Sequence, residues 1–70
     1  MGEHRIELRR DTAAQCWTAT TTGGDAERIR ALFGTTTLPT AYGLAVPAAV
    51  VRADIQALNP DAIILAPAGA

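Results

Sequence analysis

Hydrophobic and polar residues alternate near the start of the chain. His4, Ile6 and Leu8 occupy every second position of HRIELRR, and charged residues lie between them. This period places the two kinds of side chain on opposite faces of a half-buried β-strand. Residues 16–22, CWTATTT, are rich in β-branched side chains and predict a second strand. The polar segment DTAAQ between them favours a turn, so we expect an antiparallel hairpin.

The pattern changes to a helical period after this hairpin. Ile29, Leu32 and Phe33 are three and four residues apart, which places them on one face of an amphipathic helix that packs on the core. Asp25 is a suitable N-cap, whose carboxylate would accept hydrogen bonds from free backbone amides. Gly34 is expected to end the helix in the left-handed conformation.

A second helix is predicted to begin near Pro47, a residue well suited to the first turn. Val51, Ile55 and Leu58 form its apolar stripe, which Val50 widens. The Asn-Pro dipeptide at residues 59–60 ends this helix, because the residue before a proline avoids helical geometry. The apolar run in DAIIL, residues 61–65, then predicts a short strand buried on both faces.

Residues 38–44 form a third predicted strand between the two helices. Leu38, Thr40, Tyr42 and Leu44 alternate with smaller residues. Pro39 has no N–H to donate, so we expect this strand at the edge of the sheet. The order β-β-α-β-α-β predicts an α+β, two-layer fold in which two helices cover a small, mostly antiparallel sheet. Residues 1–70 are expected to form one domain, ordered over about 3–66, with a frayed C-terminal tail.

Apart from the first helix, this order resembles the HicB-type antitoxin fold, in which a three-stranded antiparallel meander precedes a helix and a last strand. The matching segments are RIELRRD, CWTAT, LPTAYGLAVPAAVVRADIQAL and AIIL. The helix DAERIRALF is a departure from that pattern. LFGTTTLPTAY, Pro47 and the LNP at residues 58–60 are also similar to small bacterial and phage proteins. The resemblance to HicB-type antitoxins implies a regulatory, inhibitor-type function, whereas the similarity to small bacterial and phage proteins implies no activity.

Composition limits how so small a chain is stabilised. A domain of 70 residues has a marginal core, to which disulfides, metals or oligomerisation usually add. Cys16 is the one cysteine and His4 the one histidine, so we expect no internal disulfide, no zinc cluster and no cofactor. A homodimer is the remaining route to added stability. The chain has neither a secretory signal nor a long apolar run, which predicts a soluble, cytoplasmic protein without membrane contact.

Two patterns are candidates for chemistry. Gly23 and Gly24 precede a helix, where backbone amides can hold a phosphate, but the P-loop spacing and lysine are missing. Cys16 and His4 would form a thiol–imidazole pair if the hairpin placed them opposite each other. A buried cysteine behaves as a small apolar residue, and we therefore expect no enzyme activity.

Two surfaces are candidates for binding a macromolecule. Large apolar residues and the predicted edge strand favour a protein partner or a second copy, and this candidate interface consists of Trp17, Leu38, Thr40, Tyr42 and Leu44. The alternative is a nucleic-acid surface on the first hairpin, consisting of Arg5, Arg9 and Arg10, with the Trp17 ring as a stacking platform. The net charge of −1 favours the protein partner. The sequence leaves open whether the edge strand pairs with another chain.

Overall fold

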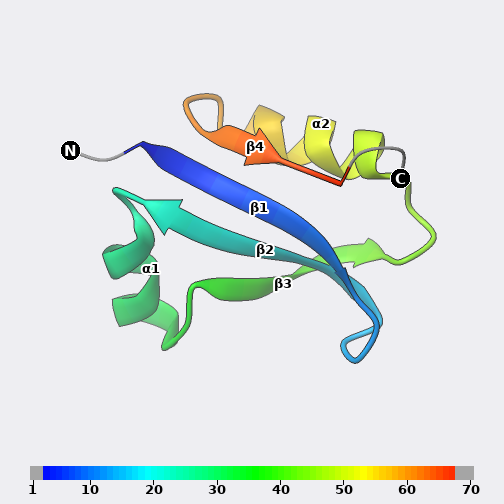
Figure 1. The fold of residues 1–70 in the computed structure, drawn as a ribbon, viewed down its shortest axis with the longest axis horizontal. Helices are drawn as coiled ribbons and strands as arrows, with labels where there is room; N and C mark the ends of the chain where they lie inside the picture. Colours follow the sequence, from blue (N-terminus) through cyan, green and yellow to red (C-terminus); the bar gives the residue numbers. More distant parts are fainter. Residues whose placement is uncertain (1–2, 68–70) are drawn as a thin grey trace.

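The computed structural model describes residues 3–67 and has the predicted order β-β-α-β-α-β (Figure 1). The strands are β1 (His4–Asp11), β2 (Cys16–Gly23), β3 (Thr37–Gly43) and β4 (Ile63–Leu65), and the helices are α1 (Ala26–Phe33) and α2 (Ala48–Leu58). The predicted α+β fold class is confirmed. Of the tail that we expected to fray, residues 68–70 lie outside the described residues.

The strands form one mixed sheet in the order β3-β2-β1-β4. β1 and β3 each pair with β2 in the antiparallel direction, and β4 pairs with β1 in the parallel direction. The β1–β2 turn is held as the sequence predicts, since Asp11 Oδ1 accepts a hydrogen bond from the Ala14 N–H at 3.1 Å. The prediction that β3 lies at an edge of the sheet is confirmed.

The core lies between α2 and one face of the sheet. Its buried side chains come from β1, β2, β4, α2 and the residue before β4: Ile6, Leu8, Trp17, Ala48, Val51, Ala62 and Ile64. Trp17 is fully buried at the centre of this cluster. A buried indole N–H needs an acceptor, and Trp17 Nε1 donates to the Val46 carbonyl oxygen at 3.0 Å. This bond joins β2 to the segment that leads into α2.

The apolar stripe of α2 is narrower than the sequence predicts. Val51 is fully buried and Ile55 half-buried, whereas Val50 is 46% and Leu58 75% exposed. Leu58 lies in the last turn, after which the chain reverses toward β4. Gln56 stabilises that reversal, because its Nε2 donates to the carbonyl oxygens of Asn59 and Ala62, each at 3.0 Å. The reversal begins before the last turn can pack on the sheet.

β4 is buried on one face, and the prediction of burial on both faces is wrong. Ile64 is buried, whereas Ile63 and Leu65 are 44% and 47% exposed. The reason is that α2 packs against one face of the sheet only, so alternate side chains of β4 point to the other face.

α1 lies at one end of the sheet, beside β2, and does not cover the core (Figure 1). None of its residues is buried, and Leu32 and Phe33 are 65% and 58% exposed. The prediction that its apolar side packs on the core is therefore wrong. Gly34 ends the helix in the left-handed conformation as predicted, with φ of 78°. Asp25 precedes the first turn, but its carboxylate makes no capping hydrogen bond.

Leu8 and Leu32 form a matched pair that tests this division between core and surface. Leu8→Ala should lower the free energy of unfolding by about 2–5 kcal/mol, because it leaves a cavity in the core. Leu32→Ala should change it by less than about 0.5 kcal/mol, because the side chain is 65% exposed. Urea denaturation followed by circular dichroism measures both. A similar loss for the two variants would contradict the exposed position of Leu32.

Candidate interaction surfaces

The predicted interface residue Trp17 lies in the core. Its side chain has 0% exposure, so it cannot contribute to a surface of the folded chain. Thr40, another predicted interface residue, fixes β3 to β2 because its Oγ1 donates to the Trp17 carbonyl oxygen at 2.8 Å. These two residues stabilise the fold. Sequence reasoning placed the tryptophan at the surface because too few helical residues seemed present to cover it.

Leu38 and Tyr42 lie on the side of β3 that faces α2, and Leu44 follows the end of the strand. Tyr42 packs against the core, and its hydroxyl donates to Asp54 Oδ2 of α2 at 2.9 Å. This hydrogen bond raises the pKa of Tyr42 above its ordinary value, because the neutral phenol is the donor. Leu38 and Leu44 are half-buried. The side chains of β3 are thus largely engaged within the chain.

The backbone of β3 is poorly suited to pair with another strand. The Thr37 N–H donates to Thr35 Oγ1 at 3.1 Å, and the Tyr42 N–H donates to Thr40 Oγ1 at 3.2 Å. Pro39 has no N–H. An added strand bonds to every second residue of an edge, and positions 37 and 39 both lack a free donor. The structure therefore blunts this edge with side-chain acceptors and a proline.

The face of the sheet opposite α2 is called here the open face. It carries Arg5, Glu7 and Arg9 of β1, and its arginines are paired along the strand. Arg5 Nε and Nη2 donate to Glu3 Oε2 at 2.8 and 2.6 Å, and Arg9 Nη2 lies 3.4 Å from Glu7 Oε2. These pairs offset the positive charge of the arginines, and a surface so balanced does not favour a polyanion.

Arg10 does not share the open face with Arg5 and Arg9. Its Cζ atom lies 4.3 Å from the centroid of the Trp17 ring, which is a cation–π contact. The three arginines proposed for nucleic-acid binding thus divide between two faces. The Trp17 ring is buried and covered by Arg10, so it offers no platform on which a base could stack.

The glycine pair before α1 forms a structural turn. Gly23 has φ of 83°, and a Cβ at this position would clash with the Glu3 carbonyl oxygen. The Gly24 N–H donates to that same oxygen at 2.9 Å, so it is not free to hold a phosphate. The carboxylate of Asp25 follows immediately. This turn packs tightly against the beginning of β1.

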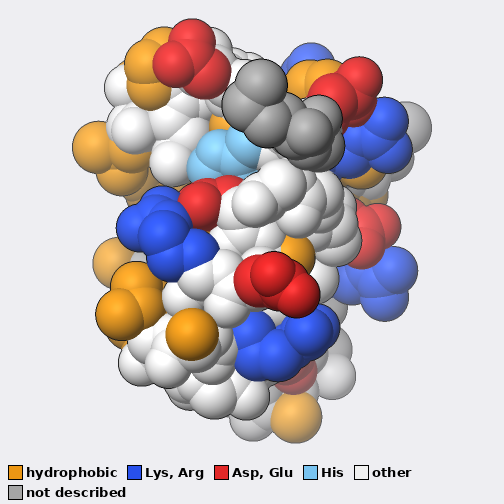
Figure 2. Space-filling model, turned by 90° about the vertical axis from the view of Figure 1, so that its left-hand side faces the viewer, with side chains coloured by type: hydrophobic (Ala, Val, Ile, Leu, Met, Phe, Trp, Pro, Cys, Tyr) orange, Lys and Arg blue, Asp and Glu red, His pale blue; other side chains and the backbone are white. Residues whose placement is uncertain are grey.

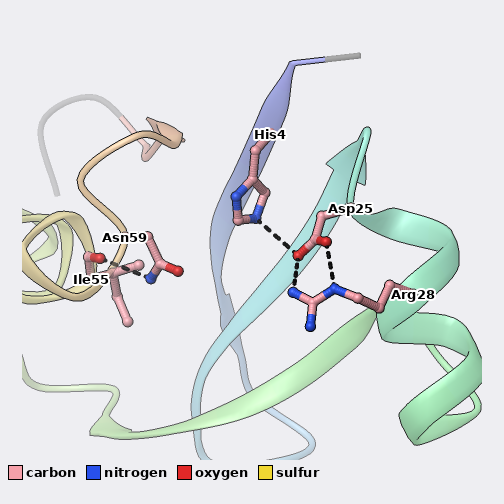
Figure 3. Close-up of polar contacts among 5 residues, drawn as sticks. All are labelled: His4, Asp25, Arg28, Ile55 and Asn59. Atoms are coloured by element: carbon pink, nitrogen blue, oxygen red, sulfur yellow. Dashed lines mark hydrogen bonds and ion pairs between the residues drawn. The ribbon is translucent and has the colours of Figure 1, made fainter. Parts of the chain in front are cut away.

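An ion-pair cluster ties α1 to β1 (Figure 3). Arg28 Nε and Nη2 each lie 2.7 Å from an oxygen of the Asp25 carboxylate, and His4 Nε2 lies 3.8 Å from Asp25 Oδ2. The hydrogen bonds from Arg28 are the main reason why the pKa of Asp25 is lower than its ordinary value. The same close-up shows Asn59 Nδ2 donating to the Ile55 carbonyl oxygen at 3.0 Å, which caps the end of α2.

Cys16 and His4 lie at opposite ends of the hairpin, so the possible catalytic pair is not formed. Cys16 is opposite Asp11, and His4 is opposite Gly23. Asp11 is seven positions after His4 along β1, so the two sites are about 24 Å apart. Within residues 3–67, no three histidine, cysteine or acidic side chains lie together as metal ligands. In the same part of the chain, no helix has the length and apolar character needed to cross a membrane.

The exposed large apolar residues are those that sequence reasoning placed in the core. They are Leu32, Phe33, Val50, Leu58, Ile63 and Leu65. The exposure of Leu32 and Phe33 could have been inferred from the pairing of β2 and β3, which are antiparallel neighbours like the two strands of a hairpin. Neighbouring antiparallel strands are only about 5 Å apart, so a helix inserted between them need not cross the sheet. It can remain at the end of the two strands, as α1 does.

Comparison of the chain with models of known families, with curated proteins and with solved structures finds no match. The structure itself has the strand and helix order that sequence analysis predicted.

The ion-pair cluster predicts how Asp25 titrates. Its lowered pKa keeps Asp25 charged in the folded chain, so its stabilising effect is present above the unfolded pKa and lost as pH falls through the folded value. Arg28→Gln should return the pKa of Asp25 toward its ordinary value. Carboxyl ¹³C NMR during acid titration measures this pKa. Arg52→Gln on α2 is the control and should leave it unchanged; an unchanged pKa in Arg28→Gln would contradict the cluster.

Proposed function

We propose that this protein is a non-enzymatic protein–protein interaction module that forms a homodimer and binds a partner protein. In its concrete form it is a regulatory inhibitor of bacterial or phage type, similar to HicB-type antitoxins. The three-stranded meander followed by α2 and β4 supports this proposal, since it is the order that the resemblance implies. A fold alone carries no activity, so the function depends on the groups at the surface.

The observation that carries the proposal is the exposed apolar end of α1. Leu32 and Phe33 lie in its last turn and are 65% and 58% exposed, while no residue of the helix is buried. A helix of eight residues is marginal in water without tertiary packing. A partner protein that covers these two side chains would supply that packing. Leu32 and Phe33 are adjacent, and contiguous exposed apolar groups are a feature of protein interaction sites.

The charges near this end indicate the chemistry of the partner surface. Arg30 lies in the last turn of α1 and forms no ion pair with any residue among 3–67, whereas Arg28 is held by Asp25. A basic side chain beside two apolar ones fits an apolar pocket with an acidic rim. We therefore propose a partner protein with that combination of groups.

The double variant Leu32→Ser/Phe33→Ser tests this proposal. It should abolish partner binding, because it removes the two apolar groups, and should leave folding intact, because both are exposed. Affinity capture from the native cells, followed by quantitative mass spectrometry, should recover a protein with the wild-type chain and about tenfold less with the variant.

Val50→Ser is the matched control, because Val50 is also exposed but lies on α2. It should retain the partner. Recovery of the same proteins with all three chains would show that α1 is not the binding site. Circular dichroism of each variant must match the wild type for the comparison to count.

A further inference from the structure

The open face carries charges of alternating sign along β1. Glu3, Arg5, Glu7 and Arg9 lie at every second position, so their side chains follow one another on this face. Figure 2 shows acidic and basic side chains alternating down the right-hand border of the molecule. Within one chain Arg9 is only weakly paired, because its Nη2 lies 3.4 Å from Glu7 Oε2 and its side chain is 69% exposed. Arg5 is bound to Glu3, but its side chain is still 52% exposed. Charges of this kind can still bind a second surface.

Apolar residues flank this charged row on the same face. Ile63 of β4 is in register with Arg5, and Leu65 is in register with Glu7. They are 44% and 47% exposed. On the other side of β1, threonines of β2 occupy the same two rows: Thr22 beside Arg5 and Thr20 beside Glu7. Two neighbouring rows therefore run across the strands of this face, and each consists of an apolar group on β4, a charged group on β1 and a hydroxyl group on β2. The charged group is Arg5 in one row and Glu7 in the other.

We propose that the open face binds the open face of a second copy, about a two-fold axis that crosses β1 at the level of Ile6. The two β1 strands are then antiparallel. The row that contains Arg5 in each copy faces the row that contains Glu7 in the other copy. Arg5 meets the partner's Glu7, and Ile63 meets the partner's Leu65. The outer charges also pair, since Glu3 meets the partner's Arg9. This assignment rests on the homodimer of the proposed function and names its surface.

The pattern selects this arrangement over its neighbours. An axis at the level of Glu7 would bring Arg5 against the partner's Arg9. An axis parallel to the strands would place each charge opposite its own copy, which is repulsive. Only the axis at Ile6 pairs opposite charges and also stacks the two apolar residues of β4 on their counterparts. Complementary charges across an interface fix its register in this way.

The open face has room for such a partner. The four strands have eight, eight, seven and three residues and give a footprint of at most about 19 by 24 Å on each copy, which corresponds to a weak interface. A hollow of about 520 Å³ lies beside Arg9 and is lined by Glu7, Thr18, Thr20 and Thr37 among others. The partner's Glu3 enters at this hollow in the proposed arrangement. An interface of this size is typical of weak, reversible association.

A charge-exchange experiment tests the register. Arg5→Glu and Glu7→Arg each place like charges opposite one another in a homodimer, so each variant alone should dimerise at least about tenfold more weakly than the wild type. An equal mixture of the two variants should form a dimer again, because Glu at position 5 then meets Arg at position 7 of the other variant. Analytical ultracentrifugation measures the association, and Arg52→Glu on α2 is the matched control that should dimerise normally.

Restored association in the mixture, with native-like circular dichroism for each variant, supports the proposal. If the wild type dimerises and both variants dimerise equally well, the homodimer stands and this surface is wrong. If the wild type is a monomer even at about 1 mM, both the surface and the homodimer are wrong, whereas partner binding through α1 is unaffected. Should a variant fail to fold, wild-type association must still weaken as salt rises from about 50 to 500 mM; undiminished association overturns the proposal.

Discussion

The burial of Trp17 is the constraint on which the rest of the structure depends. Its indole fills the space between the sheet and α2, and its N–H binds the Val46 carbonyl, so the segment before α2 has one position relative to β2. The carbonyl of the same residue accepts from Thr40, which fixes β3, and Arg10 covers the ring. Trp17 thus fixes both β3 and the segment that leads into α2 relative to β2. In a core of seven buried apolar residues, no other group is large enough to do so.

A core so small has consequences at the surface. It occupies one face of the sheet, and a single helix is enough to cover it. β4 and α1 are left with apolar side chains that the chain cannot bury, while the edge strand β3 is blunted by Pro39 and by threonine side chains. Edge-to-edge association through β3 is therefore disfavoured, which is why we propose association through side chains on the open face and on α1. The geometry moves the expected interaction surface from the edge of the sheet to its face and to the helix at its end.

The local patterns in the sequence were sufficient to predict the helices and strands, but not to predict where α1 packs. Alternation around Ile6 gave the first strand, and Gly34 gave the end of α1, because both depend on backbone preferences within a few residues. The helical period that includes Leu32 also corresponds to a helix in the structure, but it indicates only that this helix is amphipathic. What covers its apolar side depends on distant residues. Asp25 failed as a side-chain cap for a related reason, since Arg28 and His4 compete for its carboxylate.

Because α1 lies at the end of the sheet, the residues that form the core and the residues of this helix are separate. β2 and β3 are adjacent, and Thr21 already bonds to Thr36 across the base of the helix, with the Thr21 N–H 2.8 Å from the Thr36 carbonyl oxygen. The pairing of β2 with β3 is thus complete up to the residue before β3 and does not depend on α1. Residues 26–33 are free to change in evolution without cost to the core, as a loop does on a rigid scaffold. Different homologous chains could keep one scaffold and exchange this segment to recognise different targets.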